Sequence, residues 1–119
     1  MNQRLRRLVQ DRDQGCCVRC GHYCLNEPHS VHHRQPKGMG GRKGADTPSN
    51  LILLCGSGST GCHGYVHSRA DRSRDLGYLV RSRHDPATSP LWRPPDEWVL
   101  LTVDGAVVPV TAIPDEESA

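Results

Sequence analysis

The sequence predicts a small α+β domain in which bound metal supplements a thin hydrophobic core. A chain of 119 residues has the length of a single domain. Leu, Ile, Val and Phe make up only about 19% of it, but the net charge is only +2, so a folded domain fits better than a disordered chain. Six cysteines and seven histidines supply ligands with which a metal can stabilise so small a core.

The chain begins with a segment that predicts a short amphipathic helix over residues 2–13. Leu5, Leu8 and Val9 have the i, i+3, i+4 spacing of one apolar helix face, and arginines surround them. Gly15 follows as a residue that can end this helix.

Two short apolar segments and two glycine-rich loops come next. Residues 30–34 predict a strand that ends at the paired histidines. The stretch 36–50 predicts a loop, because it is rich in Gly and Pro and has no apolar period, and the brief apolar run Leu51–Leu54 follows it. The Gly-Ser stretch 56–61 predicts a second, flexible loop.

A helix over residues 62–76, capped by Gly77, is the next predicted element. A Pro-rich connection over 84–97 separates it from a C-terminal β-hairpin. The turn signal Asp104-Gly105 predicts that hairpin, with strands Trp98–Val103 and Ala106–Val110. Pro109 makes the second strand an edge strand, and the tail after Pro114 is acidic and predicted to be disordered.

The cysteines favour metal binding over disulfide formation. The N-terminal segment lacks the apolar stretch of a secretory signal, and no apolar run reaches the roughly 18 residues that cross a membrane. We therefore expect an intracellular protein, in which disulfides are disfavoured.

A four-cysteine Zn²⁺ site is the assignment that the spacing favours. Cys17-Val-Arg-Cys20 is a C-x2-C knuckle, and the Gly-Ser loop between Cys55 and Cys62 is long enough to bring those two thiolates to it. Cys16 and Cys24 compete for these places, since Cys20 and Cys24 are also a feasible pair. A structural zinc would contribute directly to folding.

The histidines suggest a second, catalytic metal. His63 and His67 lie at i and i+4, on one face of the predicted helix. His32 and His33 end a strand, whose side chains alternate, so one of them can join the helical pair while the other remains free as a base. Three ligands and an open position are typical of a catalytic metal. Three further histidines, His22, His29 and His84, are interpreted as surface or loop residues.

Charge is unevenly distributed along the chain. Residues 1–85 carry 14 Lys or Arg and seven Asp or Glu, whereas residues 86–119 carry one and six. A basic body of this kind is consistent with a polyanionic partner.

The runs VHHRQP, SNL at Ser49–Leu51, LC at Leu54–Cys55 and CHGYVH at Cys62–His67 resemble the HNH endonucleases. They are especially similar to small zinc-knuckle HNH proteins of bacteriophages, which are often encoded near packaging genes. The resemblance covers residues 16–76 and implies a ββα-metal core, two short strands and a helix around a divalent ion. Our predicted fold is therefore this core with the four-cysteine zinc knuckle and the C-terminal hairpin.

The resemblance also implies a role for each histidine. His33 matches the general base, and Asn50 matches the residue that orients the base and braces the loop. A backbone carbonyl near Asn50 is expected to hold the second nitrogen of the base. The remaining matched positions are ligands of the catalytic metal, which is Mg, Mn, Ni or Zn: His32, His63 and His67.

The implied function is metal-dependent hydrolysis of double-stranded DNA, in the cytoplasm of a phage host and with terminase or other packaging proteins as partners. Candidate phosphate contacts are Arg42, Lys43, Arg69 and Arg72, and a solvated surface charge is the equal alternative for each. We assign residues 1–83 to the nuclease domain, with the connection 84–97 and the hairpin and tail 98–119 in the same unit.

Two other functions compete with this one. A zinc-stapled DNA-binding or packaging accessory module would keep the cysteine site and the basic face, yet would need no base beside an open metal. A secreted, disulfide-stapled toxin is disfavoured by the missing signal, and a thiol count on purified protein would exclude it.

Overall fold

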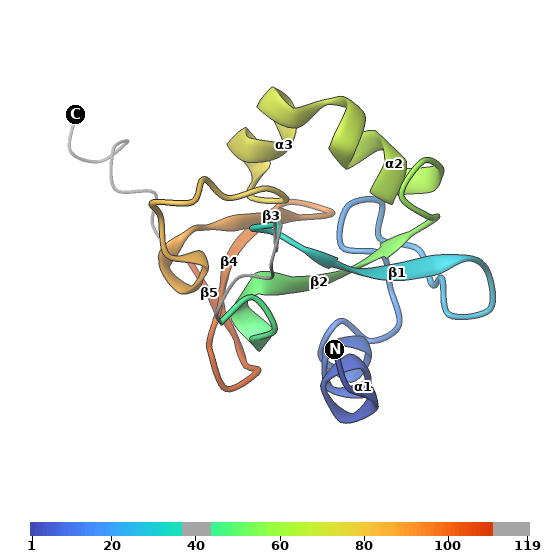
Figure 1. The fold of residues 1–119 in the computed structure, drawn as a ribbon, viewed down its shortest axis with the longest axis horizontal. Helices are drawn as coiled ribbons and strands as arrows, with labels where there is room; N and C mark the ends of the chain where they lie inside the picture. Colours follow the sequence, from blue (N-terminus) through green and yellow to red (C-terminus); the bar gives the residue numbers. More distant parts are fainter. Residues whose placement is uncertain (37–43, 111–119) are drawn as a thin grey trace.

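The computed structural model describes residues 1–36 and 44–110, and these build two small antiparallel sheets surrounded by three helices (Figure 1). The predicted acidic tail after Pro114 lies outside this range. Within it, no helix has the length and apolar character needed to cross a lipid bilayer. The elements in chain order are α1 (Gln3–Arg12), β1 (His29–His33), β2 (Leu51–Cys55), α2 (Gly61–Ser68), α3 (Ala70–Leu76), β3 (Leu91–Arg93), β4 (Glu97–Leu101) and β5 (Val107–Pro109).

Helix α1 lies where the sequence predicts it. The side chain of Asn2 caps it by accepting a hydrogen bond from the Leu5 amide (2.8 Å), and Val9 is fully buried against the β1–β2 hairpin. The chain leaves the helix through Gln14 and Gly15, which both have positive φ.

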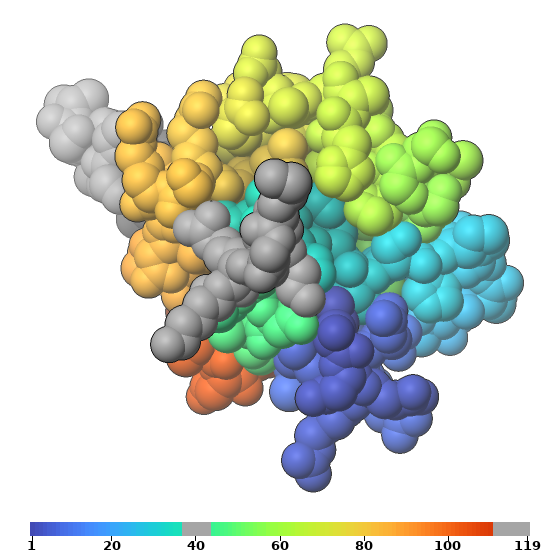
Figure 2. Space-filling model, viewed as in Figure 1, coloured from blue at the N-terminus to red at the C-terminus, as the bar shows by residue number. Residues whose placement is uncertain are grey.

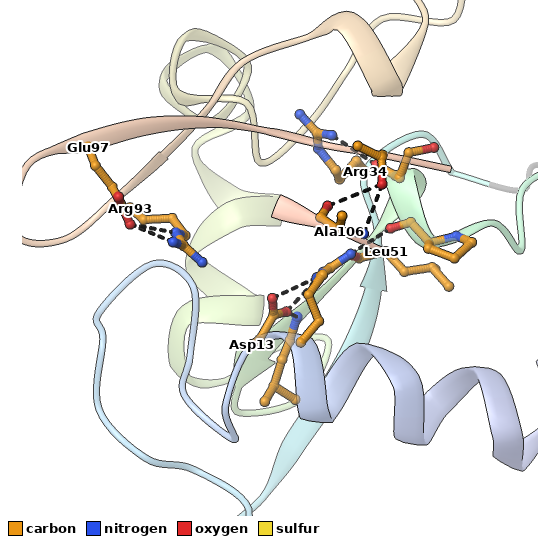
Figure 3. A network of polar contacts seen from close by, with 11 residues as sticks. Asp13, Arg34, Leu51, Arg93, Glu97 and Ala106 are labelled. Atoms are coloured by element: carbon orange, nitrogen blue, oxygen red, sulfur yellow. Dashed lines mark hydrogen bonds and ion pairs between the residues drawn. The ribbon is translucent and has the colours of Figure 1, made fainter. Parts of the chain in front are cut away.

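A polar anchor fixes the end of α1 to β2 (Figure 3). The buried carboxylate of Asp13 accepts hydrogen bonds from the Arg12 guanidinium and from the Leu53 amide (3.0 Å). Arg12 in turn donates to the Leu51 carbonyl oxygen (2.6 Å). The turn that carries the first cysteines is thus held against the central strand.

The β1–β2 hairpin is the centre of the molecule. All five residues of β2 are buried, and its register pairs His33 with Leu51 and His29 with Cys55. Because side chains alternate along β1, His32 is 2% exposed on one side while the His33 side chain is 22% exposed on the other. The predicted separation of the two histidines is therefore present.

The single helix predicted over residues 62–76 is wrong, because the chain breaks at Arg69 (φ −123°, ψ 64°) into α2 and α3. In a continuous helix the carbonyl of Val66 would accept from the Ala70 amide. Here it accepts from the buried hydroxyl of Ser73 (3.1 Å), which links α3 to the end of α2. Gly77 caps α3 in the left-handed conformation, as predicted.

The loop over residues 56–61, predicted to be flexible, is a tight turn. Gly56 has φ 87°, and a Cβ there would lie 2.1 Å from the Thr60 carbonyl oxygen. The Thr60 hydroxyl also accepts a hydrogen bond from the Ser57 amide (2.9 Å). This turn fixes the start of α2 directly beside the end of β2.

The C-terminal hairpin is confirmed, with Pro109 in the edge strand β5 of a sheet ordered β3-β4-β5. The predicted connection 84–97, however, contains the third strand. That strand has only three residues, so it shows no alternating pattern in the sequence. Its Leu91 is fully buried and joins the main core.

Candidate metal centres

Four cysteines from three parts of the chain meet in one cluster. Their sulfur atoms all lie within 4.8 Å of one another, and Cys20 Sγ is 4.0 Å from Cys55 Sγ. Tetrahedral Zn²⁺ with bonds of about 2.3 Å separates its sulfur ligands by about 3.8 Å, so the geometry fits zinc. The cluster consists of Cys17, Cys20, Cys55 and Cys62.

The surroundings of this cluster favour a bound cation. Burial raises the pKa of Cys62 and raises the pKa of Cys20 to about 11, so a nearby positive charge is needed to favour the thiolates of these two residues. The guanidinium of Arg19 supplies one such charge, because its Nη1 lies 3.3 Å from Cys62 Sγ. Arg19 is held there by stacking over the Tyr65 ring at 3.5 Å. A divalent ion would supply most of the positive charge beside the thiolates.

The other two cysteines do not join the cluster. Cys24 is fully buried in the core, where burial raises its pKa to about 12 and keeps its thiol protonated. Cys16 lies 3.5 Å from the Gln14 carbonyl oxygen. The competing pair Cys20 and Cys24 is thus not the one that the structure assembles.

His22 is exposed, as the sequence analysis interpreted it, and it also lies beside the cysteine cluster. Its Nδ1 lies 2.8 Å from Cys20 Sγ, and its Nε2 lies 2.9 Å from a carboxylate oxygen of Glu27. The hydrogen bond to Glu27 raises the pKa of His22. Contacts of this kind orient a metal ligand from outside the coordination shell. The Cys20-x-His22 spacing alone carries no clear signal for it.

Three histidines form a second cluster between β1 and α2. One nitrogen from each lies within 4.8 Å of the others, and the Nε2 atoms of His63 and His67 are 3.1 Å apart. A tetrahedral ion with bonds of 2.0–2.1 Å holds its nitrogen ligands about 3.4 Å apart, so this spacing fits two ligands of one ion. His32 completes the set, with ring centroids 5.0 and 5.3 Å from the other two.

The buried His32 is held as a neutral ring in one tautomer. Its Nε2 must carry the proton, because its partner at 2.9 Å is the carbonyl oxygen of Tyr78, which can only accept. Nδ1 therefore keeps a free lone pair. Burial lowers the pKa of His32 to about 3, so the ring stays neutral at pH 7. A neutral, oriented imidazole is the form that binds a metal.

His33 has a different partner from the one expected. The family resemblance implied a backbone carbonyl near Asn50, whereas His33 Nε2 donates to a carboxylate oxygen of Asp46 at 2.7 Å. This bond places the proton on Nε2 and leaves Nδ1 as the basic nitrogen. Nothing in the sequence singles out Asp46, which follows the glycine-rich stretch and carries no motif.

Asn50 is a buried brace. Its Oδ1 accepts from the Gln35 amide (2.7 Å), and its Nδ2 donates to the carbonyl oxygens of Gln35 (3.1 Å) and Ala45 (3.0 Å). These bonds tie together the segment just after His33 and the segment just before Asp46. Asn50 is 1% exposed, so the brace is shielded from water.

The candidate DNA contacts are only partly described. Arg69 and Arg72 are exposed, the first at the break between α2 and α3 and the second on α3. Arg42 and Lys43 lie outside the described residues.

Both clusters fall within one match to a known protein family. The family model described as HNH endonuclease matches residues 17–69, which include every cysteine and histidine of the two clusters. Neither the curated proteins nor the solved structures contain a significant match. The geometry of this chain shows the two clusters, and the family match covers both of them.

Proposed function

We propose that the HNH endonuclease domain at residues 17–69 makes this protein a metal-dependent endonuclease of double-stranded DNA. HNH domains act on DNA, which fixes the substrate class broadly. The observation that supports the specific proposal is that His33, a hydrogen-bonded and partly exposed candidate base, directly follows the buried member of a three-histidine cluster. A binding module has no use for that arrangement.

The donor set suits a divalent transition metal. His32, His63 and His67 would hold the ion, and three neutral imidazoles suit Zn, Ni or Mn better than Mg. The Nδ1 atom of His63 is buried and has no hydrogen-bond partner among the described residues. Because a neutral imidazole carries a proton on just one nitrogen, its other nitrogen keeps a lone pair that can bind a metal. When bound, the ion would act as a Lewis acid on the scissile phosphate and stabilise charge on the leaving oxygen. The cysteine cluster would hold a structural Zn²⁺.

His33 would remove a proton from the attacking water. Asp46 would fix its tautomer and favour the imidazolium that forms. Asn50 would hold His33 and Asp46 in position relative to one another through its hydrogen bonds to Gln35 and Ala45. The proposed phosphate contacts remain Arg42, Lys43, Arg69 and Arg72.

The wider setting is proposed from the resemblance alone. It comprises a phage origin, the host cytoplasm and packaging partners such as terminase. Residues 1–83 would form the nuclease unit, to which 84–97 and 98–119 belong. The contact of Arg34 with the 86–89 segment supports this grouping.

Incubating zinc-loaded protein with supercoiled plasmid tests the function. We expect nicking or linearisation with added Mn, Ni, Zn or Mg, and none in EDTA. Retarded migration of intact plasmid under every metal would instead favour a DNA-binding accessory module.

Asn50→Ala is expected to cost about 2–4 kcal/mol of folding free energy, because the substitution leaves three buried backbone groups without partners. Chemical denaturation measures this loss. The matched control is Asn26→Ala at an exposed position, for which we expect a change within about 0.5 kcal/mol. Equal stability of the two variants would contradict the bracing role.

A further inference from the structure

A pocket lined by arginines opens just beyond the end of β1. It has a volume of about 420 Å³, and no Asp or Glu is among the described residues that line it. We call it the arginine pocket, and its four arginines are Arg34, Arg74, Arg81 and Arg83.

Arg34 forms the fixed floor of the arginine pocket. It is completely buried and donates to four carbonyl oxygens, those of Gly77, Ser49, Pro86 and Ser89. Burial lowers its pKa to about 10, which still leaves it charged at neutral pH. Carbonyl dipoles satisfy its donors without cancelling its charge, so the floor attracts anions.

Arg74 has a donor to spare. Its Nη2 pairs with the exposed carboxylate of Asp71 at 2.5 Å. Its Nε is buried and has no hydrogen-bond partner within the described chain. A buried donor without a partner is costly, so Arg74 carries hydrogen-bonding capacity that its pairing with Asp71 does not use.

Arg81 and Arg83 have a fixed backbone and exposed side chains. Gln35 Nε2 donates to the carbonyl oxygens of Arg81 (2.7 Å) and His84 (2.5 Å), and the Val80 amide donates to the Arg34 carbonyl oxygen (2.9 Å). For residues 1–36 and 44–110, no carboxylate pairs with either guanidinium. Both guanidinium groups therefore extend from an anchored backbone into solvent.

The arginine pocket is coupled to the proposed catalytic centre. Asn50 binds Gln35 through two hydrogen bonds, and Gln35 holds the segment that carries Arg81. Arg34 itself directly follows His33 on the chain. In Figure 2 the segment 80–84 and α3 form one edge of the molecule, on the opposite side of β1 from α1.

A wider pocket of about 1080 Å³ continues from the arginine pocket and shares three of its arginines. Three aspartates also line this wider pocket: Asp71, Asp75 and Asp85. An anion is therefore favoured in the narrower pocket, next to β1, rather than in the wider one.

We propose that the arginine pocket binds a backbone phosphate of the DNA strand that enters the histidine cluster. The planar guanidinium fork matches two phosphate oxygens at once, and a polyanionic strand is the ligand that several cations around one pocket favour. The proposal rests on DNA being the substrate but does not depend on cleavage.

The test is DNA binding by zinc-loaded protein that carries His33→Ala, so that the duplex stays intact. Arg81→Gln with Arg83→Gln is compared with the charge-matched pair Arg4→Gln with Arg6→Gln, exposed on α1. Fluorescence anisotropy with a labelled duplex, repeated over a salt series, gives the affinity and its salt dependence. We expect the first pair to weaken binding about tenfold or more and to reduce the salt slope by about 1–2, and the α1 pair to change little.

The proposal would be overturned if both double variants lost DNA affinity equally, or if Arg81→Gln with Arg83→Gln left the salt slope unchanged. Inorganic phosphate binding, followed by ³¹P NMR, separates a free-anion site from a DNA site. Loss of phosphate binding with unchanged DNA binding would also overturn it. If wild type cleaves DNA but the arginine substitutions do not change DNA binding, the phosphate site is wrong and the nuclease function stands. If binding depends on the arginines but wild type does not cleave, the phosphate site stands and the nuclease function is wrong.

Discussion

His33→Ala is expected to slow DNA cleavage by about 10²–10⁴-fold while the fold and both clusters persist. The side chain is 22% exposed and its hydrogen bond goes to Asp46, so its removal opens no large core cavity. Single-turnover cleavage of plasmid measures the rate, and metal analysis checks the ion content. His29→Ala, four residues earlier on β1, is the control and is expected to retain full activity. A His33→Ala protein that cuts at the wild-type rate would refute the assignment of the base.

The second large effect is expected at the cysteine cluster. Cys17→Ser removes a buried ligand that joins the turn after α1 to β2 and α2. A structural zinc contributes on the order of 10 kcal/mol to folding, which is comparable with the whole stability of a small domain, roughly 5–15 kcal/mol. We therefore expect the variant to lose its zinc and to unfold or aggregate at room temperature.

Cys16→Ser is the matched control for this prediction, because it changes the neighbouring cysteine, which lies outside the cluster. Thermal melting and zinc content are compared for the two variants. Cys16→Ser should melt close to wild type with its zinc retained. A soluble Cys17→Ser protein that melts cooperatively near the wild-type temperature would show that the cluster is not a structural zinc site.

The two clusters are linked through α2. Cys62 at its start belongs to the cysteine cluster, while the next residue, His63, belongs to the histidine cluster. Zinc at the first cluster would therefore set the orientation of the helix that carries two ligands of the second. Such a linkage would help a small domain with a thin core to hold the histidine cluster in place.

Much of this arrangement could be predicted from local sequence signals. The apolar spacing of Leu5, Leu8 and Val9 predicted α1, and Asp104-Gly105 predicted the last hairpin. The i, i+4 spacing of the histidines predicted that they would meet on one side of a helix, and the structure brings them together. Such features depend on residues close together in the sequence, so a single chain reveals them.

Features that depend on distant contacts could not be predicted in this way. The break at Arg69 depends on the Ser73 hydroxyl reaching the Val66 carbonyl, and neither Gly nor Pro marks it. The bond from Asp46 to His33 joins residues from separate segments. The arginine pocket likewise depends on long-range contacts, such as the hydrogen bond from Gln35 to Arg81, 46 residues further along the chain.

The measurement that tests the central claim most directly is the dependence of the cleavage rate on added metal, for zinc-loaded wild type and for His67→Ala. His67 is exposed, so its replacement should leave the fold intact. We predict a saturable rise for wild type and at least a roughly tenfold higher half-maximal metal concentration, or no activity, for His67→Ala. His84→Ala, which changes an exposed histidine outside the cluster, should follow wild type. Identical metal dependence in wild type and His67→Ala, or cleavage that persists in EDTA, would contradict a catalytic metal at the histidine cluster.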